Sequence, residues 1–312
     1  MQTRQTFPYF LLALIVISAW GFSNIATKFL YAHGMGPYAV LALRTVIAYG
    51  ILVVLAHGRI FADSIRDELR FVLLGILCVP VYSGLENLAL TQANAGTVAA
   101  IMAAAPLLTA LIVILRWRNF RLHWMTKLGI WTATTGLILV AFDDLIMQGL
   151  SGTGFALALV AAVAWAVFTA LLKSVHSYEP LFVARKTMGW GMISVLPLFL
   201  MEDPTDAMLL TDPKLAATLL FLAAGPTTLC TVLWQRAAHA TGANAIRNGL
   251  FLIPLITIAA GGCLLGESMS FVGIMGTLMM LCGVWSADLG MKRVSAVLAG
   301  ADPKLLSAKI SY

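Results

Sequence analysis

Long apolar runs that recur along the whole chain limit what this sequence can fold into more than any other feature. Of 312 residues, 60% are hydrophobic and 11% are charged, and the mean hydropathy is +0.91. Soluble domains carry about 25% charged residues, so this composition excludes a water-facing surface for most of the chain. A hydrocarbon core about 30 Å thick needs roughly 20 residues per spanning helix. We therefore predict an all-α integral membrane protein with ten transmembrane helices, near 8–30, 38–57, 71–90, 95–116, 124–142, 153–175, 180–201, 215–238, 243–265 and 270–290.

The basic residues indicate how these spans are oriented. If the N-terminus is cytoplasmic, the other side of the membrane keeps only Lys28 and Lys214, beside several acidic residues. The positive-inside rule then predicts that both termini are cytoplasmic, in the bacterial inner membrane. The net charge of +6 forms no dense basic run, so we expect no nucleic-acid partner. The cytoplasmic basic residues would be Arg4, Arg59, Arg66, Arg70, Arg116, Arg118, Arg121, Lys127, Lys173, Arg236, Lys292, Arg293, Lys304 and Lys309.

Neither an enzyme site nor a metal site is visible in the sequence. There is no HExxH, GxSxG or Walker A motif, and the five histidines lie at or near predicted loops. The four cysteines lie inside apolar spans at unrelated spacings, which favours small core residues over a disulfide or metal framework. The first apolar run is longer than a signal-peptide core, so we interpret it as a retained helix. We expect no catalytic residues, no metal and no cofactor.

The two halves of the chain form an internal repeat. Residues 19–21 (Ala-Trp-Gly) match 164–166 (Ala-Trp-Ala), and 85–106 match 233–254 without a gap. Further along, Gly129 and Gly136 correspond to Gly276 and Gly283. Each copy contains five predicted spans, and five is odd, so the second copy enters the membrane from the opposite side. We predict a first five-helix repeat at 1–145, a second, inverted repeat at 146–291, and a cytoplasmic C-terminal tail at 292–312.

Two prolines occupy matching positions in the two copies. Pro106 and Pro254 lie in the middle of the predicted spans 95–116 and 243–265. A proline in a helix removes a backbone hydrogen bond and kinks the helix. Paired interruptions in corresponding spans indicate a central site in transporters built from repeats. The two prolines are candidate hinges beside such a site, or packing kinks that touch no substrate.

With these features in register, the chain resembles the drug/metabolite transporter superfamily, specifically its EamA-type ten-helix members. The resemblance covers residues 8–290. Where the motif Leu265-Gly266-Glu267-Ser268 has its counterpart in the first copy, the chain reads Arg118-Asn119-Phe120-Arg121 without an acid, so a paired-glutamate role is not carried over. The other motifs are Ala19-Trp20-Gly21 with Lys28, the Pro37–Arg44 segment, and the small-residue segments that end at Pro106 and Pro254.

Glu86 is the carboxylate that we place inside the hydrocarbon region, and Arg44 should lie at a similar depth. An ionisable side chain inside a span costs at least ~2.5 kcal/mol, so each of the two needs a physical reason. One interpretation is an Arg44–Glu86 ion pair that offsets both desolvation costs. The other is that Glu86, with Arg44 beside it, couples transport to protons. The two are compatible if the pair breaks during transport.

The second half carries cations that have no acidic partner within its own spans. Arg185 and Lys186 lie in the span 180–201, and Arg247 and Asn248 lie near the start of the span 243–265. Snorkelling to the cytoplasmic interface suits Lys186. Arg247 is instead a candidate for attracting an anionic group on the substrate.

Large aromatic residues lie within spans, although Trp and Tyr usually concentrate at the membrane interfaces. Trp20 and Trp165 are related by the repeat, which favours a place facing a central cavity. Aromatic faces together with amide groups suit amphipathic solutes. Lipid or helix-packing contact is the alternative for any one of them. The candidate substrate-binding residues are Trp20, Asn24, Tyr82, Glu86, Asn87, Trp165, Trp234, Gln235, Arg247 and Asn248.

Together with the resemblance, these features predict a secondary transporter. Because no nucleotide-binding motif is present, transport would be driven by a gradient. The resemblance implies an exporter of small organic metabolites, such as amino acids or related amphipathic solutes and drugs, that works by alternating access. Alternatives are an importer or exchanger of nucleoside-like or cofactor-like solutes, a channel, or a lipid-processing membrane protein. We expect a small-molecule substrate and membrane lipid as partners, and a monomer or homodimer.

Overall fold

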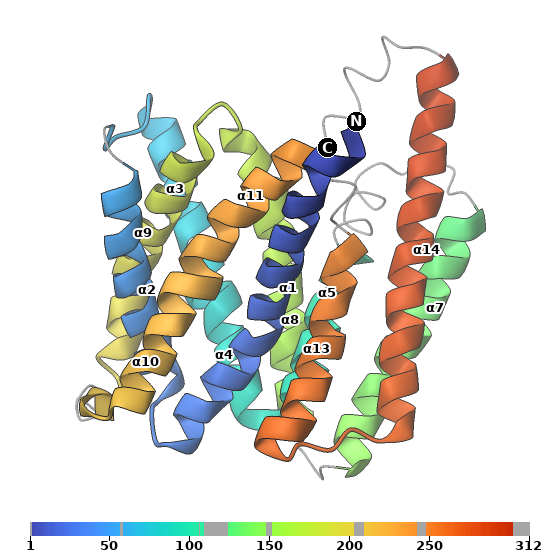
Figure 1. Ribbon diagram of the computed structural model, residues 1–312, viewed down its shortest axis with the longest axis horizontal. Helices are drawn as coiled ribbons and strands as arrows, with labels where there is room; N and C mark the ends of the chain where they lie inside the picture. The colour runs from blue at the N-terminus through green and yellow to red at the C-terminus, as the bar shows by residue number, and fades with distance from the viewer. Residues whose placement is uncertain are drawn as a thin grey trace.

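The computed structural model is a bundle of helices that run roughly parallel or antiparallel to one another (Figure 1). The structure describes residues 2–56, 59–105, 107–108, 124–147, 152–202, 209–241 and 248–301, and within these ranges it contains no strand. The first copy contributes α1 (Gln2–Ala32), α2 (Pro37–Leu55), α3 (Ile65–Ile76), the π-helical segment η1 (Leu77–Ser83), α4 (Gly84–Gln92), α5 (Ala95–Ala103) and α7 (Trp124–Met147). The second contributes α8 (Thr153–Leu172), η2 (Lys173–Val175), α9 (Pro180–Phe199), α10 (Pro213–Leu222), η4 (Ala223–Leu229), α11 (Cys230–Thr241), η5 (Asn248–Phe251), α13 (Leu252–Ala260), η6 (Gly261–Leu265) and α14 (Phe271–Ala301).

Seven helices in the described ranges are long and apolar enough to cross a membrane. They are Pro8–Ala32, Pro37–Leu55, Ile65–Gln92, Trp124–Asp143, Thr153–Val175, Pro213–Trp234 and Phe271–Gly290, and each coincides with a predicted span. Three predicted spans remain. The span 180–201 contains α9, and the span 243–265 contains a shorter apolar helix at Gly249–Leu265. The span 95–116 is described only in its first half. The count of ten crossings therefore stays a prediction. Helix α14 continues to Ala301, so the predicted tail begins as helix.

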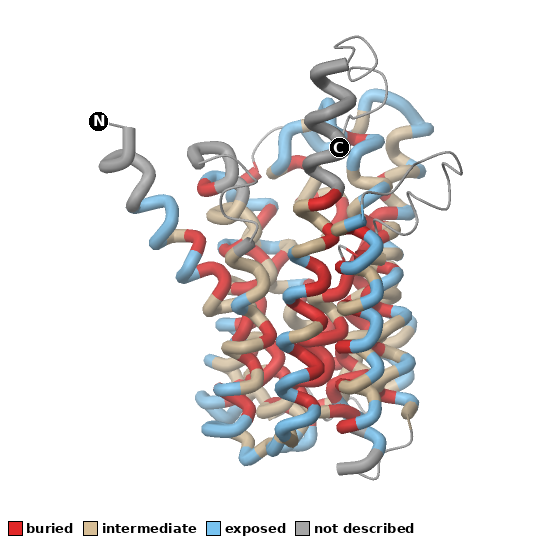
Figure 2. Tube along the Cα trace, turned by 90° about the vertical axis from the view of Figure 1, so that its right-hand side faces the viewer, coloured by how far each residue is buried: buried red, intermediate tan, exposed pale blue. Residues whose placement is uncertain are grey.

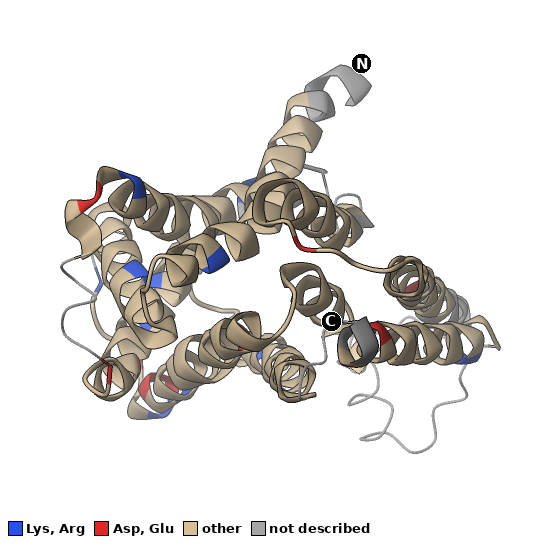
Figure 3. Ribbon diagram, turned by 90° about the horizontal axis from the view of Figure 1, so that it is seen from below, with Lys and Arg blue, Asp and Glu red and all other residues tan. Residues whose placement is uncertain are grey.

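The burial pattern is that of a protein surrounded by lipid. Buried positions lie where helices face one another, and exposed positions form the outer surface (Figure 2). Many exposed side chains are large and apolar, among them Val54, Trp131 and Phe142. Viewed along the helix axes, Lys, Arg, Asp and Glu are few among the other residues (Figure 3). An apolar outer surface of this extent is stable in hydrocarbon, where the helices satisfy their own backbone polar groups.

Equivalent helices of the two copies run in opposite directions. Lys28, near the end of α1, donates a hydrogen bond to the carbonyl of Ala93 (2.8 Å). Thr153, at the start of α8, donates to the side chain of Gln92, next to Ala93. The end of α1 and the beginning of its counterpart α8 thus lie on one side of the bundle, as an inverted repeat predicts. We call this side the side opposite the N-terminus.

In each copy, one π-helical segment interrupts the third helix, and the two segments occupy matching positions. Segment η1 contains Pro80 and joins α3 to α4, and η4 contains Pro226 and joins α10 to α11. Hydroxyl groups donate to carbonyls five residues earlier in both segments, from Ser83 to Cys78 (3.1 Å) and from Thr228 to Ala223 (2.8 Å). A π-helical turn inserts an extra residue and often marks a functional site. The paired interruptions predicted from the sequence were at Pro106 and Pro254, and these two π-helical segments were not predicted.

Helices α7 and α14 pack side by side and antiparallel through glycines (Figure 1). A Cβ atom added at Gly136 would lie 2.4 Å from the Met280 nitrogen, and one at Gly129 would lie 2.6 Å from the Gly283 carbonyl oxygen. Gly136 thus faces Gly276 and Gly129 faces Gly283, so each glycine meets the repeat counterpart of the other one. Small residues allow this close approach, which increases dispersion contact between helices in lipid.

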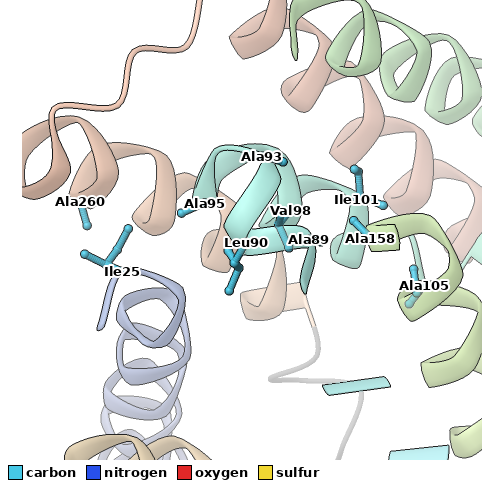
Figure 4. Close-up of a cluster of buried hydrophobic side chains, with 11 residues drawn as sticks. Ile25, Ala89, Leu90, Ala93, Ala95, Val98, Ile101, Ala105, Ala158 and Ala260 are labelled. Atoms are coloured by element: carbon cyan, nitrogen blue, oxygen red, sulfur yellow. The ribbon is translucent and has the colours of Figure 1, made fainter. Parts of the chain in front are cut away.

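A core of small side chains holds the two copies together near the side opposite the N-terminus. Ile25 of α1, Leu90 of α4 and Val98 of α5 pack with Ala158 of α8 and Ala260 of α13 (Figure 4). Because most partners are alanine, the helix backbones approach closely. The core fixes the ends of helices whose middle sections carry the polar and aromatic candidates.

Candidate functional site

Two aromatic pairs cross between the copies in the middle of the bundle. Trp20 of α1 contacts Trp234 of α11, with ring centroids 5.5 Å apart. Trp165 of α8 contacts Tyr82 of η1, with centroids 4.7 Å apart. Since Trp20 and Trp165 correspond in the repeat, each copy places its tryptophan against the third helix of the other copy. That both tryptophans face a central cavity stays a prediction.

The π-helical segments set the geometry of both pairs. Tyr82 belongs to η1 itself. The indole nitrogen Nε1 of Trp20 donates to the carbonyl of Pro226 in η4 (3.0 Å). Pro226 has no N–H to offer to the Leu222 carbonyl, which instead accepts the hydroxyl of Thr227 (2.8 Å). The irregular backbone of η4 thus provides the acceptor that orients Trp20.

Arg44 lies on the inner side of α2. Val46 and Val53 are exposed on the outer side of this helix, and at 100° per residue Arg44 lies on the opposite face. Its charge acts on Cys78, Tyr82 and Glu86, which follow one another along one face of the third helix. In the described part of the chain its guanidinium has neither an ion-pair partner nor a hydrogen-bond partner.

Glu86 faces the same space from α4. It is hydrogen bonded to the Tyr82 hydroxyl, one helical turn earlier. Among the described residues, the ion pairs are Lys28–Glu267, Arg59–Asp63, Arg70–Asp67 and Lys186–Glu68. Arg44 and Glu86 interact electrostatically but do not form a direct pair, which would require an N–O distance of about 4 Å or less. The direct ion pair, which was one of the two interpretations of these residues, is therefore absent from this conformation.

The other polar candidates differ in their surroundings. Asn87 is 1% exposed, and its amide donates to the Pro37 carbonyl (3.1 Å), so it holds the start of α2. Asn24 is buried in α1. Tyr31 is not among the residues predicted from the sequence. Its hydroxyl is buried, has no hydrogen-bond partner among the described residues, and lies within electrostatic reach of Arg44 and Glu86.

Several candidates cannot be located in this way. Pro106 and Arg247 lie outside the described residues, as do the side chains of Gln235 and Asn248. Pro254 is buried at the third position of α13, directly after the 3₁₀ segment η5. A proline in the first turn of an α-helix loses no helical hydrogen bond. Pro254 thus marks a change of helix type, and its role as a hinge stays a prediction.

On the side opposite the N-terminus, a polar cluster joins three elements. We call Lys28, Ala93, Ala95 and Glu267 the Glu267 cluster. Lys28 pairs with Glu267, which lies in the connection between η6 and α14. The second carboxylate oxygen of Glu267 accepts the backbone N–H of Ala95 at the start of α5 (2.8 Å). The family resemblance named both charged residues, but their contact spans 239 positions and no local pattern shows it.

On the N-terminal side, a second cluster joins α3 to α9. We call Glu68, Lys186 and Trp190 the Glu68 cluster. Lys186 forms an ion pair with Glu68, which also accepts the indole N–H of Trp190 (2.9 Å). The acidic partner of Lys186, which the second half lacks, thus comes from the first copy, and snorkelling of Lys186 to the interface stays a prediction. Arg185 is buried as well and donates to the carbonyls of Ala56 and Arg59.

Beside the Glu68 cluster, the connection before α3 is tied to the turn before α9. The Tyr178 hydroxyl donates to Asp67 (3.0 Å) and accepts the backbone N–H of Asp63 (2.9 Å). A hydrogen bond from the Arg59 guanidinium lowers the pKa of the Asp63 carboxyl. Each side of the bundle therefore has a polar cluster that joins the first copy to the second.

Both halves of the chain match one family. Residues 7–142 and residues 152–287 each match the EamA-like transporter family. This chain belongs to the EamA-like transporter family. It is thus a multi-pass transporter protein of the inner membrane, and the resemblance to the drug/metabolite transporter superfamily is confirmed.

Full-length relatives of this EamA-family chain are named as transporters. An uncharacterized transporter of Archaeoglobus fulgidus is 25% identical over 87% of this chain and 95% of its own length. A "probable amino-acid metabolite efflux pump" of Escherichia coli is 21% identical over 93% of this chain and 98% of its own length. A crystal structure at 18% identity superposes with a TM-score of 0.60, covering 92% of this chain and 98% of the other, which shows a shared fold.

Proposed function

We propose that this EamA-family protein is a secondary carrier that exports amino acids and related amphipathic metabolites by alternating access. The observation that carries the proposal is the pair of polar clusters on opposite sides. The Glu267 and Glu68 clusters each join one copy to the other, and the candidate site around Arg44 and Glu86 lies between them. Opening one cluster while the other stays closed would expose this site to one side at a time.

The choice of substrate rests on chemistry and on relatives. Aromatic faces at Tyr82–Trp165 and Trp20–Trp234 suit apolar groups, and Arg44 and Glu86 provide charges of both signs. Two relatives, from Escherichia coli and Salmonella typhimurium, bear the name of amino-acid metabolite efflux pumps. In this proposal Glu86 also takes up a proton in one half of the cycle, which couples export to the proton gradient.

Counterflow in proteoliposomes tests the proposal. Vesicles loaded with a mixture of unlabelled amino acids should transiently accumulate a labelled amino acid from outside. The uptake rate should saturate as the external concentration rises, and it should be higher than in vesicles without internal amino acids. Flux that rises linearly without saturation would identify a channel. Counterflow of nucleosides, with no response to amino acids, would favour the alternative of an exchanger for nucleoside-like solutes.

Coupling and direction need separate measurements. An imposed proton gradient should drive amino-acid transport by the native protein, and Glu86→Gln should retain counterflow but lose this acceleration. Undiminished proton-driven transport in Glu86→Gln would remove Glu86 from coupling. Cells that produce the protein should release preloaded amino acid faster than cells that produce Glu86→Gln if the direction is export.

A further inference from the structure

Arg44 is a cation inside the bundle that forms no ion pair with any residue that the structure describes. Its position opposite Val46 and Val53 points it away from lipid and toward the third helix. It is half-buried, so the guanidinium is neither sealed in the core nor part of the outer surface. Within the described residues it donates no hydrogen bond, although a guanidinium carries five N–H donors in a planar fork that fits a carboxylate.

Glu86 faces the same space, and none of the described cations lies at pairing distance from it. Only the Tyr82 hydroxyl is hydrogen bonded to it among the described residues, which leaves acceptor capacity on both oxygens. Glu86 is also half-buried. Two opposite charges that interact without forming a direct ion pair both keep hydrogen-bonding capacity that a third group, on a bound molecule, can use.

The surroundings limit what that molecule can be. An anion bound to Arg44 alone would be repelled by Glu86, and a cation bound to Glu86 alone would be repelled by Arg44. A molecule with one carboxylate and one ammonium group satisfies both side chains and leaves the site electrically balanced. The ring pair Tyr82–Trp165, next to Glu86, offers an apolar surface to the rest of such a molecule.

We propose that Arg44 and Glu86 form a head-group subsite for zwitterionic amino acids, in which Arg44 holds the carboxylate and Glu86 holds the ammonium group. The subsite rests on the proposed function and makes it more specific, because it requires both charges on one substrate. Tyr31 lies in electrostatic reach of both residues, and its unpartnered hydroxyl adds a donor for the same carboxylate.

Competition in the counterflow assay tests the subsite. The probes are cysteine, leucine and phenylalanine, each compared with its methyl ester, which lacks the carboxylate, and with its N-acetyl derivative, which lacks the ammonium group. For each amino acid that competes, we expect both derivatives to compete at least about tenfold more weakly, since each loses one charge-assisted interaction.

Two substitutions assign the two contacts. Arg44→Gln should abolish the preference for free acid over methyl ester and leave the preference for free amine over N-acetyl derivative. Glu86→Gln should abolish the preference for free amine over N-acetyl derivative and leave the preference for free acid over methyl ester. Arg66→Gln and Glu179→Gln, which change exposed charges away from the site, should keep both preferences. Arg44→Lys retains the charge. This variant should keep the preference for free acid over methyl ester even if its rate of counterflow falls.

The outcomes separate the subsite from the proposed function. If the native protein exchanges amino acids but accepts esters and N-acetyl derivatives equally well, the subsite is wrong and amino-acid transport stands. The subsite is also wrong if Arg44→Gln or Glu86→Gln alters both preferences alike, or alters the other preference. If no amino acid is exchanged and other solutes are, the proposed function fails and the subsite falls with it.

Discussion

Lys28, at the end of α1, forms an ion pair with Glu267, which lies 239 positions later in the connection before α14. Both side chains are mostly buried, with 21% and 13% of their surface exposed. Lys28 also donates to the Ala93 carbonyl and Glu267 accepts the Ala95 N–H, so the pair fixes the turn between α4 and α5. One contact thus joins the beginning of the first copy to the end of the second.

Loss of one partner of this pair should destabilise the protein. In Glu267→Gln the Lys28 ammonium loses its counter-ion, and the expected cost is about 1–3 kcal/mol. Thermal unfolding of the purified protein in detergent should show a lower melting temperature. The exchange Lys28→Glu with Glu267→Lys should recover part of the loss. If the exchange is no better than the sum of the two single variants, the pairing contributes nothing.

The contact between α7 and α14 should tolerate no added side chain at its glycines. In Gly136→Ala the new methyl group would lie 2.4 Å from the Met280 nitrogen and 2.5 Å from the Gly276 oxygen, so the helices must separate. Overpacking of this kind costs about 1–3 kcal/mol. Size-exclusion profiles and melting temperatures should deteriorate for Gly136→Ala.

Gly50→Ala is the matched control for this glycine prediction. A Cβ atom at Gly50 meets nothing within 4 Å, although this glycine also lies in a membrane helix. We expect Gly50→Ala to be neutral or slightly stabilising, because alanine favours helix more than glycine does. Equal behaviour of the two variants would show that α7 and α14 do not pack as closely as described.

The two tryptophans related by the repeat should respond differently to the same change. Trp20→Phe removes the Nε1 donor to the Pro226 carbonyl, whereas the described contacts of Trp165 are ring contacts with Tyr82 and Phe168. Trp20→Phe should therefore cost about 1 kcal/mol more than Trp165→Phe. Melting temperatures of the two variants check this, and a larger loss in Trp165→Phe would contradict it.

The Glu68 cluster should control opening on the N-terminal side. Glu68→Gln weakens the contact to Lys186 while keeping an acceptor for Trp190, so that side should open more often. We expect faster labelling of a cysteine introduced at Tyr82 by a reagent added from the N-terminal side. Glu179→Gln, at an exposed position near the start of α9, serves as the control. Unchanged labelling in Glu68→Gln would show that this cluster only stabilises the fold.

Much of the architecture could be predicted from the sequence, because membrane helices follow local rules. Apolar length located every helix that the structure identifies as long enough to span a membrane. The repeat predicted that α1 and α8 run in opposite directions. It also matched Gly129 to Gly276 and Gly136 to Gly283, and all four glycines lie in the contact between α7 and α14, where Gly129 faces Gly283 and Gly136 faces Gly276. The repeat also matched Trp20 to Trp165 and so indicated that both occupy equivalent places.

The candidate site was predictable only in part. The sequence predicted that Arg44 and Glu86 lie at a similar depth in the membrane, because the depth of a residue follows from its position along the spanning helix. Whether they touch depends on how each helix is rotated about its axis, and helix packing sets that rotation. The π-helical segment η1 inserts an extra residue into the helix just before Glu86 and so changes the direction in which Glu86 points, which no periodic pattern in the sequence indicates.

The sequence by itself therefore determined that the chain lies in a membrane, that it contains an internal repeat, and which charged residues lie within the membrane spans. Only the tertiary structure decided which charged side chains form ion pairs. Lys28 pairs with Glu267 across 239 positions, and Lys186 pairs with Glu68 across 118 positions. Arg44 and Glu86, for which an ion pair was one of two interpretations, do not form a direct pair. The physical reason is that an ion pair needs contact within about 4 Å, and such contact depends on the packing of distant helices.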